Sequence, residues 1–204
     1  MINKFSLIWL ALFATVFTWS AWYPKDYPTW ALEVAPAVIA LLVLIYTRKT
    51  FPLTPLVYGL ILMHCIILMI GGHYTYAEVP LFEYFKEVFG FERNNYDKLG
   101  HLAQGFVPAM VAREILLRKS TLTNGKLVFL IVTSIALAIS AIYEIIEWWV
   151  ALLSSEAAEA FLGTQGYVWD TQSDMLMALI GAIVAQLTIA SMHNQQLKRF
   201  NGNQ

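Results

Sequence analysis

The chain has 204 residues, of which 58% are hydrophobic and 13% are charged, and its mean hydropathy is +0.59. Soluble domains contain about half apolar and about a quarter charged residues, so this composition excludes a water-soluble globular protein. The net charge of −1 does not indicate a nucleic-acid binder. A single cysteine, Cys65, excludes an internal disulfide and a thiolate zinc cluster. The composition predicts an integral membrane protein.

Six stretches of the chain are long and apolar enough to cross a hydrocarbon core of roughly 30 Å, which takes about 20 residues of helix. They cover approximately residues 5–22, 29–46, 53–72, 97–117, 126–153 and 171–192. No convincing cleavage site follows the first stretch, so we interpret it as an uncleaved span. The sequence therefore predicts one domain over residues 1–204, an all-α polytopic bundle of six transmembrane helices.

The basic residues predict the orientation of these spans, because cytoplasmic loops are enriched in Lys and Arg. With the N-terminus inside, nine of the 13 basic residues fall on the cytoplasmic side. These nine are Lys4, Arg48, Lys49, Arg113, Arg118, Lys119, Lys126, Lys198 and Arg199. We therefore expect both termini to be cytoplasmic.

Residues 80–90, between the third and fourth spans, have the pattern of a short amphipathic helix. Leu81, Phe85 and Val88 share one helical face, whereas Glu83 and Glu87 share the other. This pattern is typical of a helix that lies in the membrane interface. The helix would form either a lid over the bundle or a simple cap, and the sequence leaves both open.

Acidic and histidine side chains recur in the last three spans, although a charged group costs about 2.5–3.5 kcal/mol near the centre of a membrane helix. Three pairs stand three or four residues apart and so share a helix face: Asp97 and His101, Glu144 and Glu147, Asp170 and Asp174. A rise of about 1.5 Å per residue places all three pairs in the outer part of the bilayer. His73, at the outer end of the third span, reaches a similar level. We therefore predict one polar site, open to the outside, formed by spans three to six.

Each pair also has a purely structural interpretation, since polar side chains in membrane bundles often only bond a neighbouring helix, for about 1 kcal/mol. We interpret His64, near the middle of the third span, as such a buried hydrogen-bonding residue, distant from the site. Glu33, early in the second span, either extends outward to water or joins the site. Gly181 and Ala185 give the sixth span a small-residue face on which another helix approaches closely.

Two kinds of chemistry fit these residues. A divalent metal such as zinc, iron or manganese would take ligands from His73, His101, Glu144, Asp170 and Asp174. A catalytic set would comprise His101, Asp97, Glu144, Glu147 and Asp174, with His101 as base or ligand. Lys98 or Arg93 would then contact a phosphate, although we expect no buried arginine beside the acids. A di-iron site is unfavoured because the chain has no Glu-x-x-His motif.

Four segments resemble the YjdF type of bacterial inner-membrane protein. They are GGHYTYAEVP (71–80), NYDKLGHLAQGF (95–106), EIIEW (144–148) and WDTQSDM (169–175). The resemblance covers nearly the whole chain. It implies a multi-pass protein of the bacterial inner membrane and supplies no activity.

The last three spans also show a more distant similarity to VanZ-like membrane proteins, which are associated with glycopeptide resistance. Asp97, Lys98 and His101 match the D-K-x-x-H start of that pattern. Its later E, D and G positions fall on Glu144, Asp174 and Gly181, whereas Glu147 and Ala178 replace a usual Gln and Asn. This similarity implies a shared polar site at the outer face.

Three functions are open at this point. The first is a catalyst that acts on an envelope lipid or a lipid-linked precursor. The second is a small proton-coupled transporter in which Glu144 and Glu147 exchange protons. The third is a non-catalytic membrane scaffold. The expected partners are membrane lipids, with no nucleic acid, and the sequence does not predict an oligomeric state.

Overall fold

The computed structural model describes residues 4–153 and 164–201, and within these ranges every regular element is helical. The elements are α1 (Lys4–Ala21), α2 (Tyr27–Thr47), α3 (Pro55–Tyr74), the 3-10 turn η1 (Tyr76–Glu78), α4 (Pro80–Phe89), α5 (Tyr96–Lys119), α6 (Lys126–Leu153), α8 (Asp170–Thr188) and α9 (Ala190–Asn201). The prediction of an all-α fold is confirmed.

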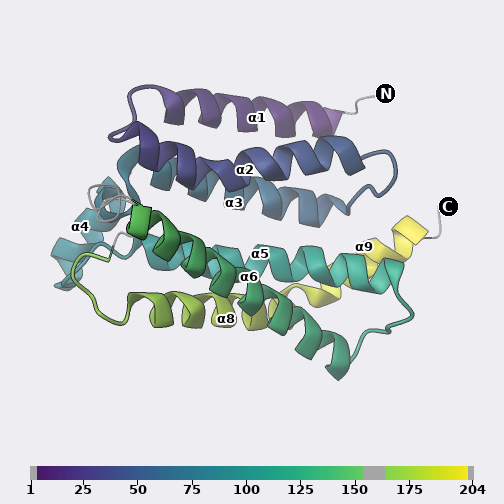
Figure 1. Cartoon of the computed structure of the whole chain (residues 1–204). Coiled ribbons are helices and arrows are strands. Elements are labelled where there is room, and N and C mark those ends of the chain that lie inside the picture. The colour runs from purple at the N-terminus through teal and green to yellow at the C-terminus, as the bar shows by residue number, and fades with distance from the viewer. Residues whose placement is uncertain (1–3, 154–163, 202–204) are drawn as a thin grey trace.

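The long helices form two layers (Figure 1). α1, α2 and α3 make up the first layer, and α5, α8 and α9 make up the second, with α6 crossing obliquely beside them. The first residues of α1 and the last residues of α9 lie at the same end of the bundle. The opposite end is where α5 and α8 begin, and it holds the polar pairs predicted from the sequence.

Four of the helices, α1, α2, α3 and α6, are long and apolar enough to cross a membrane. α8 and α9 together give a fifth candidate, but they are bent by 58° at Ile189. The single helix predicted over 171–192 is therefore wrong only in its last four residues, because α8 ends at Thr188 and α9 begins at Ala190. The reason is that the segment after Ile189 is polar, so α9 packs as a separate amphipathic helix instead of extending the span.

Proline and a side-chain cap determine where several helices begin. Pro28, Pro55 and Pro80 each stand in the first turn of their helix, where the missing N–H costs nothing. Asp26 precedes α2, and its carboxylate accepts a 2.7 Å hydrogen bond from the backbone N–H of Thr29. These signals make the link between α1 and α2 a tight hairpin.

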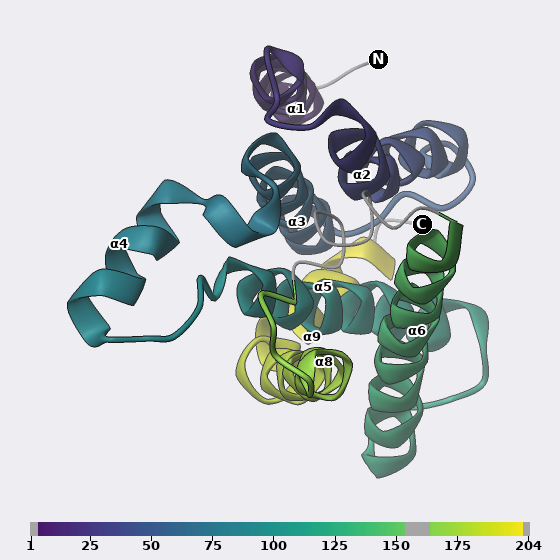
Figure 2. The same cartoon turned by 60° about the vertical axis from the view of Figure 1, so that its left-hand side comes forward.

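α4 stands apart from the bundle (Figure 2), as the amphipathic pattern predicts for a separate helix. None of its residues is buried, and Leu81, Tyr84, Val88 and Phe89 are each more than half exposed. On the other side of the helix, Phe82 packs edge-on against the Tyr96 ring at 5.1 Å. α4 therefore rests on the start of α5 by one aromatic contact and leaves an apolar surface open.

Glycines allow α5 and α8 to meet at the level of their backbones. A Cβ at Gly105 would overlap the carbonyl group of Ala178, and a Cβ at Gly181 would overlap the carbonyl oxygen of Leu102. Ala185, farther along α8, is fully buried. The small-residue face predicted for Gly181 and Ala185 is thus the face with which α8 packs on α5.

A second buried polar network joins α9 to α5 and to the start of α3. His193 lies between two side chains of α5, with its Nδ1 2.8 Å from Arg113 Nη1 and its Nε2 3.0 Å from Glu114 Oε2. Glu114 also accepts hydrogen bonds from the N–H and the hydroxyl of Thr54. Glu114 and His193 are fully buried and have partners on both sides, so this network fixes the end of the bundle where α9 lies.

Replacing Gly105 by Ala is expected to destabilise the protein. The added methyl group would push α8 away from α5, and overpacking of this kind costs about 1–3 kcal/mol. The measurement is the thermal unfolding midpoint of the purified protein in detergent. Gly59→Ala is the matched control, since a Cβ there meets nothing within 4 Å. An unchanged midpoint for Gly105→Ala would contradict the close packing.

Candidate functional site

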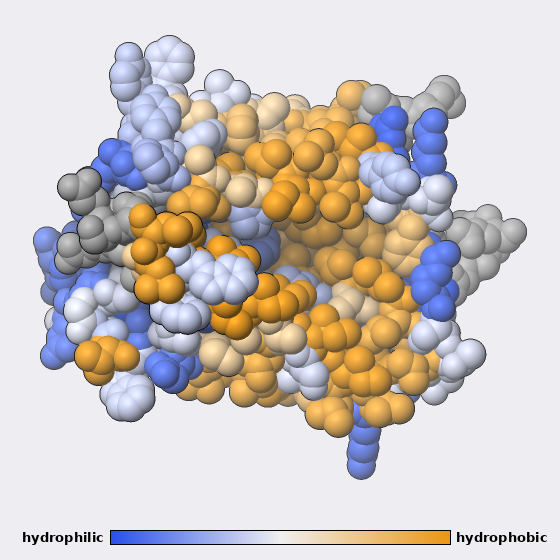
Figure 3. Space-filling model, in the orientation of Figure 1, coloured by the Kyte–Doolittle hydropathy of each residue, from blue (hydrophilic) through white to orange (hydrophobic). Residues whose placement is uncertain are grey.

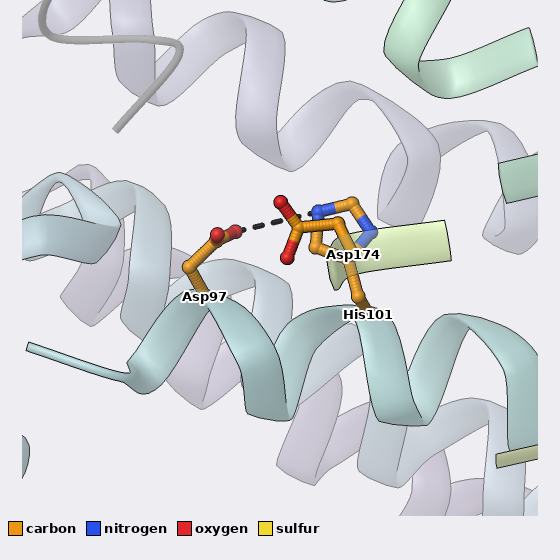
Figure 4. A group of neighbouring side chains, drawn as sticks. All are labelled: Asp97, His101 and Asp174. Atoms are coloured by element: carbon orange, nitrogen blue, oxygen red, sulfur yellow. Dashed lines mark ion pairs between the residues drawn. The ribbon is translucent and has the colours of Figure 1, made fainter. Parts of the chain in front are cut away.

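The candidate site lies at the end of the bundle where α5 and α8 begin. The first two turns of α5 carry Asp97 and His101, and Asp174 reaches them from α8 (Figure 4). The three side chains are buried, although each is polar. Because α5 and α8 touch through glycines one to two turns deeper, residues at their starting turns necessarily face one another.

His101 is held between carboxylates from two different helices. Its Nε2 lies 3.4 Å from Asp97 Oδ1, on the same helix. Its Nδ1 lies 3.7 Å from Glu144 Oε1 of α6 and 3.1 Å from the side-chain oxygen of Gln104. The Glu144 Oε1 atom is buried and makes no hydrogen bond within the described residues. The imidazole therefore has an acidic group on each side, which suits a residue that receives and releases protons.

Two cations balance part of the acidic charge. Lys98 Nζ lies 2.6 Å from Asp174 Oδ1 and 2.8 Å from Asp170 Oδ1. Arg93, in the loop before α5, donates to Asp170 and lies 3.5 Å from Asp97 Oδ2. The expectation that no arginine would be buried near the acids is wrong, since the Arg93 side chain is only 11% exposed. Arg93 precedes the predicted span by about one helical turn. It lies in a loop, and a loop has no periodicity from which the direction of a side chain could be predicted.

A small cavity of about 20 Å³ continues the site toward the middle of the bundle, large enough for about one water molecule. Its wall includes His101, Glu147, Glu33, His64 and Tyr143. Glu33 therefore joins the site instead of reaching outward, and it accepts a 3.3 Å hydrogen bond from the Tyr143 hydroxyl. The interpretation of His64 as distant from the site is wrong, because α3 packs on α5 with His64 facing the cavity that His101 lines.

His73 is the one predicted site residue that the structure does not bring to the others. Its Nδ1 lies 3.0 Å from the carbonyl oxygen of Ser20, and its ring packs on Trp19 with 4.5 Å between ring centres. Both partners belong to α1. His73 therefore serves the contact between α3 and α1, because the C-terminal turn of α3 faces α1 at this point.

The buried acidic charge exceeds the basic charge. Six acids face two permanent cations, Arg93 and Lys98, and two histidines, His101 and His64. The acids are Glu33, Asp97, Glu144, Glu147, Asp170 and Asp174, and each is at most 8% exposed. Carboxylates so close together in a low dielectric cannot all be ionised without a proton or a cation among them. The site is therefore built to hold protons or an added cation.

Three residues have the arrangement of a metal site. One ligand atom each from Asp97, His101 and Asp174 lies within 4.8 Å of the other two. A nitrogen and two carboxylate oxygens suit zinc, iron or manganese. Of the other predicted ligands, Glu144 lies beside the trio, with its Oε1 3.7 Å from His101 Nδ1. Asp170 forms ion pairs with Arg93 and Lys98. A metal at this trio would compete with the Lys98 ammonium for Asp174, because the two cations repel each other.

Sequence reasoning missed Tyr143 and Gln104, although helical spacing offered a signal for both. Tyr143 stands four residues before Glu147, and Gln104 stands three after His101, so each shares a face with a predicted site residue. Both side chains reach the cavity. Polar side chains one turn from each predicted site residue are thus the signal that points to both.

The fold and the buried polar site define a multi-pass helical membrane protein. The sequence matches the family described as predicted membrane protein (DUF2238) over residues 5–195. The inner membrane protein YjdF of Escherichia coli (strain K12) is 53% identical over 175 residues, which cover 86% of this chain and 84% of that protein. No solved structure matches the chain.

The chain therefore belongs to the DUF2238 family of membrane proteins, and the resemblance to the YjdF type is confirmed. The similarity to YjdF and the apolar helices of the chain together support its assignment as a multi-pass protein of the inner membrane. The similarity to VanZ-like proteins stays a prediction.

Replacing Lys98 by Gln is expected to raise the affinity of the trio for Zn²⁺ or Mn²⁺ at least tenfold. Loss of the ammonium removes a repulsion that amounts to about 4 kcal/mol for two unit charges 4 Å apart at an effective dielectric constant of 20. The measurement is equilibrium dialysis of the purified protein with elemental mass spectrometry. Lys86→Gln, which removes a cation from α4, is the matched control. Equal metal retention by all three proteins would count against a metal at this trio.

Proposed function

We propose that this protein is an inner-membrane enzyme that performs acid–base chemistry on a lipid-linked substrate at the outer leaflet. In this proposal the chain crosses the membrane six times with both termini cytoplasmic, so the polar site faces outward. The observation that carries the proposal is the position of His101 between Asp97 and Glu144. A histidine that one carboxylate orients and a second carboxylate faces is the usual arrangement for proton transfer to a substrate.

The roles of the neighbouring side chains follow from this arrangement. Asp97 holds Nε2 of His101 and fixes the orientation of the ring. Nδ1 then faces Glu144, so a proton can pass between the ring and a substrate group bound beside that carboxylate. Lys98 lies one turn before His101 on α5, and Arg93 lies in the loop before α5, where both would meet the phosphate of a lipid-linked substrate.

A route from the membrane supports a lipid-linked substrate over a soluble one. Figure 3 shows a recess in the apolar face between α2 and α6, with hydrophilic surface at its floor. The two helices that flank the recess are joined by a hydrogen bond from the Tyr143 hydroxyl of α6 to Glu33 of α2. A headgroup entering here would reach the site while its chains stay in the membrane. α4 stands on the other side of the bundle from this entrance (Figure 2), so it leaves the entrance uncovered.

Proton-coupled transport is the second candidate, and one observation favours it. The cavity below His101 is lined by Glu33, His64 and Tyr143, which extend the titratable groups toward the middle of the bundle. A proton relay would need such a series of titratable side chains. The third possibility, a scaffold, would use the same residues only to hold helices together.

The test follows lipids in proteoliposomes made with a bacterial inner-membrane lipid extract. We expect the wild-type protein to convert a lipid or lipid-linked component, detected by chromatography and mass spectrometry. His101→Gln and Glu144→Gln should each lower the rate at least 100-fold, because loss of a general acid–base group typically costs 10²–10⁴-fold. His73→Gln and Glu87→Gln are matched controls, since the first lies against α1 and the second is exposed on α4.

Folding of each variant is verified by its thermal unfolding midpoint. Identical lipid profiles for the wild-type proteoliposomes and for empty liposomes would overturn the proposal that this protein is an enzyme. A proton flux that depends on His101 and His64, measured with a dye trapped in the same liposomes, would then favour transport. Loss of folding in the His101 and Glu144 variants alone would favour the scaffold.

A further inference from the structure

A groove of about 630 Å³ lies at the other end of the bundle, between α1, the end of α2 and the start of α3. Its volume falls in the range of roughly 300–1,000 Å³ that is usual for ligand sites. Leu10, Leu41 and Ile45 are among the apolar residues along its length. One of its walls is fixed without a ligand, because the indole N–H of Trp9 donates a 2.8 Å hydrogen bond to the carbonyl oxygen of Tyr58.

The rim of this groove is basic. Arg48 and Lys49 line it, both are exposed, and among the described residues neither has an acidic side chain within 4.0 Å. Arg118 and Lys119 lie beside it, at 4.0 and 5.3 Å from the centre of the Phe51 ring. Glu114 is the acid near this end, and it is buried and already paired with Arg118 and His193. No residue that lines the groove is acidic.

We propose that this groove binds an anionic phospholipid. Its phosphate would lie at Arg48 and Lys49, and one acyl chain would run along the apolar residues of α1 and α2. Two features support this occupant over a second protein chain. The apolar length and the basic rim occur together in one groove, which matches the two parts of an anionic lipid. The same end carries most of the basic residues of the chain, as expected for the leaflet whose headgroups it would contact.

The test is native mass spectrometry of the delipidated full-length protein in detergent, titrated with phosphatidylglycerol or with phosphatidylcholine of the same acyl chains. We expect phosphatidylglycerol to bind at least tenfold more tightly than phosphatidylcholine. The double variant Arg48→Gln, Lys49→Gln should lose most of this preference. The matched control is Lys198→Gln, Arg199→Gln, which removes the same charge from the exposed end of α9 and does not touch the groove.

A third variant tests the apolar part of the groove. Leu10 is exposed in the groove, so Leu10→Trp should fill it without disturbing the bundle. We expect this variant to bind both lipids less well, at least fivefold for phosphatidylglycerol. Equal binding of the two lipids by the wild type, or equal losses in the two double variants, would reduce the effect to general charge attraction and overturn the proposal. A dimer that excludes lipid and is lost in Leu10→Trp would assign the groove to a second copy instead.

Discussion

The backbone contact between α5 and α8 is the constraint on which the polar site depends. Gly105 and Gly181 let the two helices touch with no side chain between them. Only at that separation does Lys98 reach Asp174 at 2.6 Å, and only then does Asp174 come within ligand distance of His101. A larger residue at either glycine would move the helices apart and separate these groups, because packed interiors do not yield freely.

Burying so many ionisable groups at one end of a membrane bundle has a desolvation cost, which nearby opposite charges must offset. Arg93 and Lys98 offset part of it by pairing with Asp170 and Asp174. Glu33, Glu144 and Glu147 have no lysine or arginine within 4.0 Å among the described residues, so this end of the protein can take up protons or a metal ion. That capacity, more than any single residue, supports chemistry at this site over a purely structural role.

The sequence predicted the long helices well, because hydropathy and proline signals act locally. It could also place three polar pairs on shared helix faces, since spacing of three or four residues decides that. It could not predict that His64 would join the site or that His73 would leave it, because each depends on which face α3 turns toward α5 or α1. The bend at Ile189 was likewise not predicted, because the segment after it is polar but carries no glycine or proline to mark the break.

The network around His193 determines which nitrogen of that imidazole carries its hydrogen. Arg113 is always protonated and can only donate, so the His193 Nδ1 that it contacts must be an unprotonated acceptor. The single ring hydrogen then resides on Nε2 and is donated to Glu114. Its neighbours therefore leave His193 one tautomer, in which the ring bridges Arg113 and Glu114. His101, in contrast, has only oxygen atoms beside its two ring nitrogens, from Asp97, Gln104 and Glu144, so its neighbours do not select one tautomer.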